Sequence, residues 1–150
     1  MENTIKNGKI VQDNELNRVT LTEDKQALLF VWKHVSGLTL LDFKDGIAQF
    51  AAGLCKTYKP ARAIFDARLL DSSGDPFAWV TGQKKFEGEE EYNTWWMREI
   101  VPIYNEAGIS SLSVATGDPN APGELKNMSE QVHFKVGYFE GIETAMEWKK

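Results

Sequence analysis

The residues best placed to do chemistry in this sequence are Asp66 and Arg68, which follow an apolar segment. On a strand, two residues that are two positions apart point to the same side, so these side chains can form an ion pair. Open α/β sheets bind their ligands at the carboxyl ends of the strands. Asp66 and Arg68 are therefore candidates for a ligand or partner surface, and a purely structural ion pair is the alternative.

A group of aromatic residues is the second candidate. Trp95 and Trp96 lie about 100° apart on a helix, so both are buried only if that helix is broadly covered. With Trp79 and Tyr104 they form a candidate surface for a partner or an apolar ligand. Pro102 should kink the helix and let it act as one wall of a pocket. In the alternative interpretation both tryptophans pack on the sheet.

No residues form a recognised catalytic or metal-binding pattern. The two histidines, His34 and His133, lack ligand partners at helical spacing. Cys55, the single cysteine, lies near the C-terminal end of an apolar helix stripe, where a buried thiol is expected rather than a nucleophile. We therefore expect no catalytic residue, no cofactor and no metal ion, and a protein that is not an enzyme.

The composition is that of one globular domain spanning residues 1–150, with a polar segment at about 1–8. The net charge of −5 argues against nucleic acid, because phosphate binding needs clustered Lys and Arg. No apolar run approaches the ~20 residues of a membrane span, and the first residues lack the apolar core of a signal peptide. We expect a cytoplasmic protein.

The periodicity predicts strands that alternate with helices, which implies an α/β fold with a mostly parallel sheet. The expected strands are 19–22, 27–32, 61–66, 109–115 and 134–138, and the expected helices are 39–58, 76–81, 89–107, 124–131 and 142–148.

Three short motifs, in a fixed order, carry a resemblance to a known family. They are Phe65-Asp66-Ala67-Arg68, then Trp95 to Pro102 followed by Ala107-Gly108-Ile109, and finally Phe139-x-x-Ile142-Glu143-x-Ala145-x-x-Trp148. Over residues 27–148 the sequence resembles the SpoIIAA-like family, small bacterial proteins with the sulfate-transporter/anti-sigma-antagonist (STAS) type of fold. The resemblance implies a single domain with a sheet of four or five mostly parallel strands flanked by helices, and no established common activity. Relatives by fold include anti-sigma antagonists, which bind a protein partner, and SEC14-like carriers of apolar ligands.

The tetrapeptide Asp71-Ser72-Ser73-Gly74 is similar to one that anti-sigma antagonists carry after this strand, where a serine is phosphorylated. On that resemblance Ser72 and Ser73 are candidates for a phosphorylation switch, since a phosphate repels or recruits a partner by its charge. The spacing from Asp66 is shorter than in the antagonists. A plain turn, for which Ser, Gly and Asp are the usual residues, is the alternative.

From the sequence we expect a non-enzymatic binding or regulatory module of the SpoIIAA-like type, with an unidentified protein as its partner. The first alternative is a carrier or sensor of a small apolar ligand or lipid, held beside the Trp95/Trp96 helix. The second alternative is an enzyme with no recognisable motif. A homodimer and a monomer with a closed pocket both fit the aromatic content.

Overall fold

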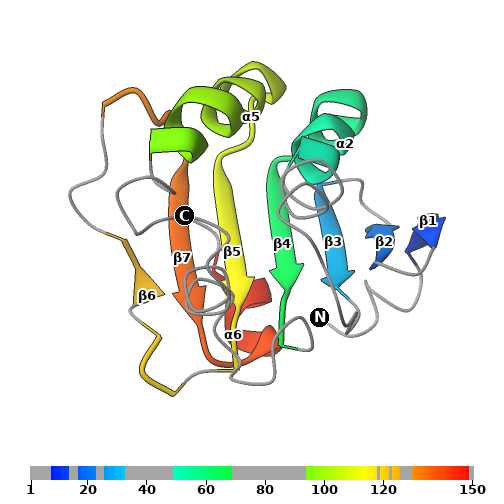
Figure 1. Cartoon of the computed structure of the whole chain (residues 1–150). Helices are drawn as coiled ribbons and strands as arrows, with labels where there is room; N and C mark the ends of the chain where they lie inside the picture. The colour runs from blue at the N-terminus through cyan, green and yellow to red at the C-terminus, as the bar shows by residue number, and fades with distance from the viewer. Residues whose placement is uncertain are drawn as a thin grey trace, which may run out of the picture.

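A mixed β-sheet organises the part of the chain that this computed structural model describes, which is residues 8–13, 17–22, 26–32, 49–68, 94–117, 119–121, 123–125 and 130–148. In sheet order its seven strands are β1 (Lys9–Asp13), β2 (Asn17–Leu21), β3 (Ala27–Trp32), β4 (Arg62–Asp66), β5 (Ser111–Ala115), β7 (Lys135–Phe139) and β6 (Gly123–Glu124). Strands β3, β4, β5 and β7 are parallel to one another (Figure 1). The described residues form a single α/β domain.

Three α-helices and one π-helical turn accompany the sheet in the described residues. They are α2 (Phe50–Tyr58), the π turn (Trp96–Ile100), α5 (Val101–Ala107) and α6 (Ile142–Glu147). Helices α2 and α5 lie side by side at the amino ends of the parallel strands, and α6 lies near their carboxyl ends (Figure 1). The Lys56 ammonium joins α2 to α5 by an ion pair of 2.9 Å with Glu106, which lowers the pKa of that carboxyl.

The two faces of the sheet carry separate apolar clusters because side chains alternate along each strand. The face toward α2 and α5, here the α2/α5 face, includes Leu28, Phe30, Trp32, Leu112 and Val136. The opposite face, here the α6 face, includes Ala27, Leu29, Ile64 and Ala115, together with Ala145 and Met146 of α6. Strand β3 is an almost continuous apolar run because both of its faces are covered.

Helix α6 is held on the sheet by polar contacts at close range. The Ser113 hydroxyl on β5 donates a 2.9 Å hydrogen bond to the carbonyl of Ala145. The Arg62 guanidinium on β4 donates to the carbonyls of Met146 and Trp148, at 2.6 and 3.3 Å. Carbonyls at a helix C-terminus lack intrahelical partners and favour positive charge, so Arg62 stabilises this end of α6.

The helical segment before β5 contains one wide turn. The backbone N–H of Val101 donates to the carbonyl of Trp96, five residues back, which is the π-helical pattern. Pro102, which follows directly, has no N–H to donate to a regular helix. The wide turn therefore lies directly before the proline, and regular α-helix follows it in α5. Gly108 ends α5 in the left-handed conformation with φ = 77°.

The structure confirms the α/β class and the five expected strands, but the sheet is wider than four or five strands. It is also not mostly parallel. Of its six pairings, three are parallel (β3–β4, β4–β5, β5–β7) and three are antiparallel. The two additional strands give little sequence signal, because β1 is mostly polar and bulged between Ile10 and Gln12, and β6 has only two residues.

Of the expected helices 39–58, 89–107 and 142–148, the described parts are confirmed by α2, α5 and α6. The helix expected at 76–81 lies outside the described residues. The helix expected from residue 124 is wrong at its start, because Glu124 pairs with Gly137 in the sheet. In the described part of the chain, no helix has the length and apolar character needed to cross a membrane.

Candidate functional site

Asp66 and Arg68 lie together at the carboxyl end of β4. The carboxylate accepts two hydrogen bonds from the guanidinium, Nε to Oδ1 at 2.7 Å and Nη2 to Oδ2 at 2.8 Å. The Arg68 backbone N–H approaches the same Oδ1 at 3.4 Å. The ion pair predicted from their spacing is therefore confirmed, in the bidentate geometry that fixes an arginine in one orientation.

The two partners differ in exposure. The side chain of Asp66 is only 12% exposed, whereas that of Arg68 is 44% exposed. The hydrogen bonds to Asp66 raise the pKa of Arg68 above its usual value, so the guanidinium stays protonated. Asp66 engages the Nε and Nη2 side of the fork, and the remaining edge of the guanidinium includes Nη1. This is a positioned cation at the edge where α/β sheets bind their ligands.

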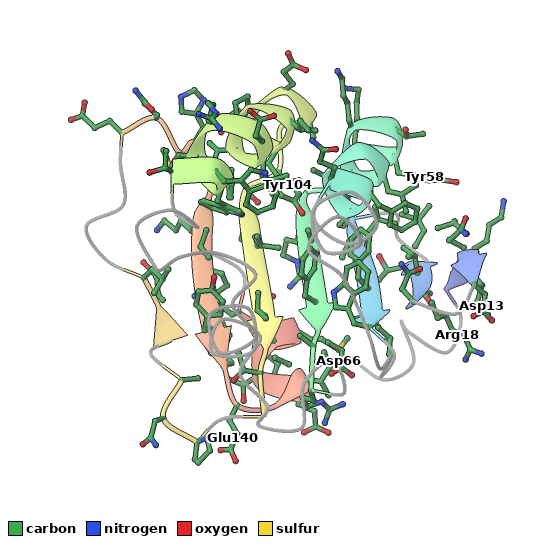
Figure 2. All side chains as sticks on the ribbon, in the orientation of Figure 1. Asp13, Arg18, Tyr58, Asp66, Tyr104 and Glu140 are labelled. Carbon is green, nitrogen blue, oxygen red and sulfur yellow. The ribbon has the colours of Figure 1, made fainter. Side chains whose placement is uncertain are left out.

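Backbone hydrogen bonds continue the sheet ladder beyond the strands and hold this edge together. The Ala67 N–H donates to the backbone carbonyl of Ala115 at 2.9 Å, and the Gly117 N–H donates to the backbone carbonyl of Glu140 at 2.8 Å. Thr116 donates to the Phe139 carbonyl through its N–H at 2.8 Å and through its hydroxyl at 3.2 Å. Figure 2 shows Asp66 and Glu140 at this same end of the sheet. We call the set Asp66, Arg68, Thr116, Gly117 and Glu140 the carboxyl edge.

The aromatic candidates lie elsewhere, packed around Phe134. Tyr104 is 1% exposed, with its ring centroid 5.5 Å from that of Phe134, and Figure 2 shows it at the end of the sheet opposite Asp66. Trp95 is buried, whereas Trp96 is half-buried and meets Phe134 edge-on at 6.2 Å. The described members of this group thus make intramolecular core contacts.

The π turn decides which tryptophan is buried. A regular helix would align Trp96 with Ile100, four residues on. The wide turn instead aligns Trp95 with Ile100, five residues on, and both are buried. After the turn the regular spacing resumes with Tyr104, which explains why that residue lies in the core.

Several candidates lie outside the described residues, namely Ser72, Ser73, Trp79, His34 and the segment at about 1–7. His133 is described, and its backbone N–H donates to Asn105 Oδ1 at 3.0 Å. Burial raises the pKa of the Cys55 thiol to about 12, which keeps it protonated and unreactive. Within the described ranges, no three His, Cys, Asp or Glu side chains gather as metal ligands would.

One polar feature was missed from the sequence, on the α2/α5 face. Trp32 at the end of β3 is 1% exposed, and its ring stacks on Phe30 and meets Phe65 edge-on. Asn17 on β2 is opposite Trp32 in the strand register, and it is also fully buried. Trp32 was expected at the end of a strand, whereas Asn17 precedes the expected strand 19–22. The hairpin register that brings the two residues together cannot be deduced from either segment alone.

No known protein family, curated protein or solved structure matches this chain. Its function is therefore inferred from its sequence and its geometry.

Proposed function

We propose that this chain is a non-enzymatic binding or regulatory module of the STAS-like, SpoIIAA-like type, which binds a protein partner at its carboxyl edge. The observation that carries the proposal is the Asp66–Arg68 pair. It holds an exposed arginine in a fixed orientation at the carboxyl end of a parallel strand.

A fixed arginine suits recognition for an energetic reason. A free arginine side chain loses up to about 2 kcal/mol of rotamer entropy when a partner immobilises it. Asp66 has already restricted Arg68, so less entropy is lost on binding. The guanidinium edge that includes Nη1 then pairs with a carboxylate or a carbonyl oxygen of the partner.

The sheet supports the proposal at a coarser level. The parallel strands β3, β4, β5 and β7 with helices on both faces are compatible with the STAS-like type. The bonds from Ala67, Thr116 and Gly117 stiffen the edge that would meet the partner. A stiff, preformed surface is the usual condition for binding with little change of backbone shape.

The carrier hypothesis takes second place. Its one favourable observation is Trp96, which stays half-buried although Trp95 and Tyr104 are in the core. Titration with fatty acids or phospholipid tests it, since the tryptophan emission should shift in the wild type and less in Trp96→Phe. A flat titration across several lipid classes would reject the carrier hypothesis.

Affinity capture tests the main proposal. Four proteins serve as baits in lysate of the source organism: the wild type, Arg68→Gln, Arg68→Lys and the control Arg98→Gln. Quantitative mass spectrometry identifies the captured proteins. Arg98 is a matched control because it is also an exposed arginine beside a carboxylate, Glu99, in the π turn. We expect one protein to be captured by the wild type and by Arg98→Gln, and to fall at least ~10-fold with both Arg68 variants. Equal capture by all four baits would contradict the proposal.

A further inference from the structure

Within the described part of the chain, the indole N–H of Trp32 is a buried donor without a hydrogen-bond acceptor. Trp32 is 1% exposed, and its Nε1 has no hydrogen-bond partner in the described structure. The great majority of buried polar atoms in folded proteins are hydrogen-bonded, because an unpaired donor loses its bonds to water without replacement. A buried indole N–H without an acceptor among the described residues is therefore a candidate donor to a bound molecule.

The described ring contacts of Trp32 are with uncharged aromatic side chains. The Trp32 ring stacks on Phe30 at a centroid distance of 5.8 Å and an interplanar angle of 12°. Phe65 meets Trp32 edge-on at 5.5 Å. Asn17, in register on β2, supplies a carboxamide with both donor and acceptor atoms on the same face of the sheet.

The position along the strands also favours a ligand. Trp32 is the last residue of β3, so the donor lies at the carboxyl end of a parallel strand. Its side chain belongs to the cluster on the α2/α5 face, whereas Asp66 on β4 is opposite Val31, whose side chain packs on the α6 face. The two features are therefore separate, and either can be removed without the other.

We propose that the Trp32 indole N–H binds a small, neutral, planar ligand that carries a hydrogen-bond acceptor, such as an aromatic or heteroaromatic carbonyl compound. The acceptor oxygen takes the N–H of Trp32, and the ring system packs against the neighbouring aromatic side chains. A charged ligand is disfavoured, because transferring it among Phe30, Trp32 and Phe65 removes its hydration without a compensating charge.

Two probe molecules of matched shape test this inference. Coumarin is neutral and planar and carries a carbonyl acceptor, whereas naphthalene has the same fused-ring body without one. Each is titrated into the full-length ¹⁵N-labelled protein, and the five indole N–H cross-peaks are followed by NMR. Trp32→Phe assigns the Trp32 peak and removes the donor while it keeps an aromatic ring.

We expect coumarin to move the resonance of the Trp32 indole proton downfield. Coumarin should also bind ~10-fold more tightly than naphthalene, which corresponds to the contribution of one hydrogen bond to a buried donor. In Trp32→Phe the two probes should bind equally. The control Trp148→Phe, a half-buried tryptophan that packs on Phe139 on the α6 face, should keep the preference for coumarin.

Three results would overturn the inference: binding of neither probe, equal affinity of both for the wild type, or a preference for coumarin that survives in Trp32→Phe. The ratio of the two affinities is read within one variant, so a general loss of stability does not imitate the expected result. Arg68→Gln should leave the ratio unchanged, which separates this inference from the proposed protein-binding edge.

Discussion

The Asp66–Arg68 pair should contribute measurably to stability, and a double-mutant cycle measures how much. An exposed ion pair is worth about 0–1 kcal/mol, and breaking a fully buried one costs about 3–5 kcal/mol. The side chain of Asp66 is 12% exposed and that of Arg68 is 44% exposed, so this pair lies between the two limits. We expect Arg68→Gln to lower the free energy of unfolding by about 2 kcal/mol.

The cycle compares the wild type, Asp66→Asn, Arg68→Gln and the double variant. Two residues in direct contact should not be additive, and we expect a coupling energy of about 1.5 kcal/mol. Arg68→Lys should retain most of the loss, because an ammonium cannot reproduce the two parallel bonds of 2.7 and 2.8 Å.

Urea unfolding followed by circular dichroism gives the four free energies. As a second readout, a loss of about 2 kcal/mol should lower the melting temperature by roughly 4–8 °C for a chain of this size. A coupling energy below about 0.3 kcal/mol, within the error of additivity, would show that the ion pair does not stabilise the fold. The arginine would then be solvated and mobile, and the basis of the proposed binding edge would be lost.

Three further predictions concern the core. Gly137→Ala should lower the free energy of unfolding by about 1–3 kcal/mol, because a Cβ there would lie 2.8 Å from two ring atoms of Phe139 and 3.3 Å from Trp148. Thermal unfolding checks this prediction. An unchanged melting temperature would mean that the rings move aside. Arg62→Gln should lower the free energy of unfolding by about 2 kcal/mol, because the hydrogen bonds to the carbonyls of Met146 and Trp148 are lost. Hydrogen exchange should show faster opening of α6. Unchanged exchange would contradict the stabilisation of the α6 C-terminus by Arg62. Burial raises the pKa of Cys55 from 9.0 to about 12, so above pH 9 the unfolded state loses this proton first and stability falls. Relative to Cys55→Ala, the wild type should lose about 1.4 kcal/mol between pH 8 and pH 10, and parallel pH profiles for the two proteins would contradict the burial of the thiol.

The central strands were predictable because their apolar residues indicate that both faces of each strand are buried. The run from Ala27 to Trp32 is apolar at every position, and it is covered on both faces. Strand β1 was not predictable, because its polar residues alternate poorly and a bulge interrupts its register. The π turn was not predictable in position either. Pro102 indicated a distortion, but whether Trp95 or Trp96 joined the core depended on one extra residue in that turn.

The candidate site divides in the same way. The Asp66–Arg68 pair follows from local spacing, because the two residues are only two positions apart at the end of β4 and can meet without contributions from distant segments. The buried pair of Asn17 and Trp32 depends on the register of two strands, and the supporting bonds of Thr116 and Gly117 depend on the pairing of β5 with β7. Such relations arise from tertiary structure and cannot be predicted from the sequence of either segment.

Site-specific photo-crosslinking tests the proposed binding edge most directly. A benzoylphenylalanine replaces Glu140 at the carboxyl edge in one protein, and Tyr58, an exposed residue at the opposite end, in another (Figure 2). We expect one discrete protein adduct from the Glu140 position, lost when Arg68→Gln is added, and none from the Tyr58 position. Adducts of equal yield from both positions, or an adduct at the Glu140 position that is unaffected by Arg68→Gln, would contradict the proposed binding edge.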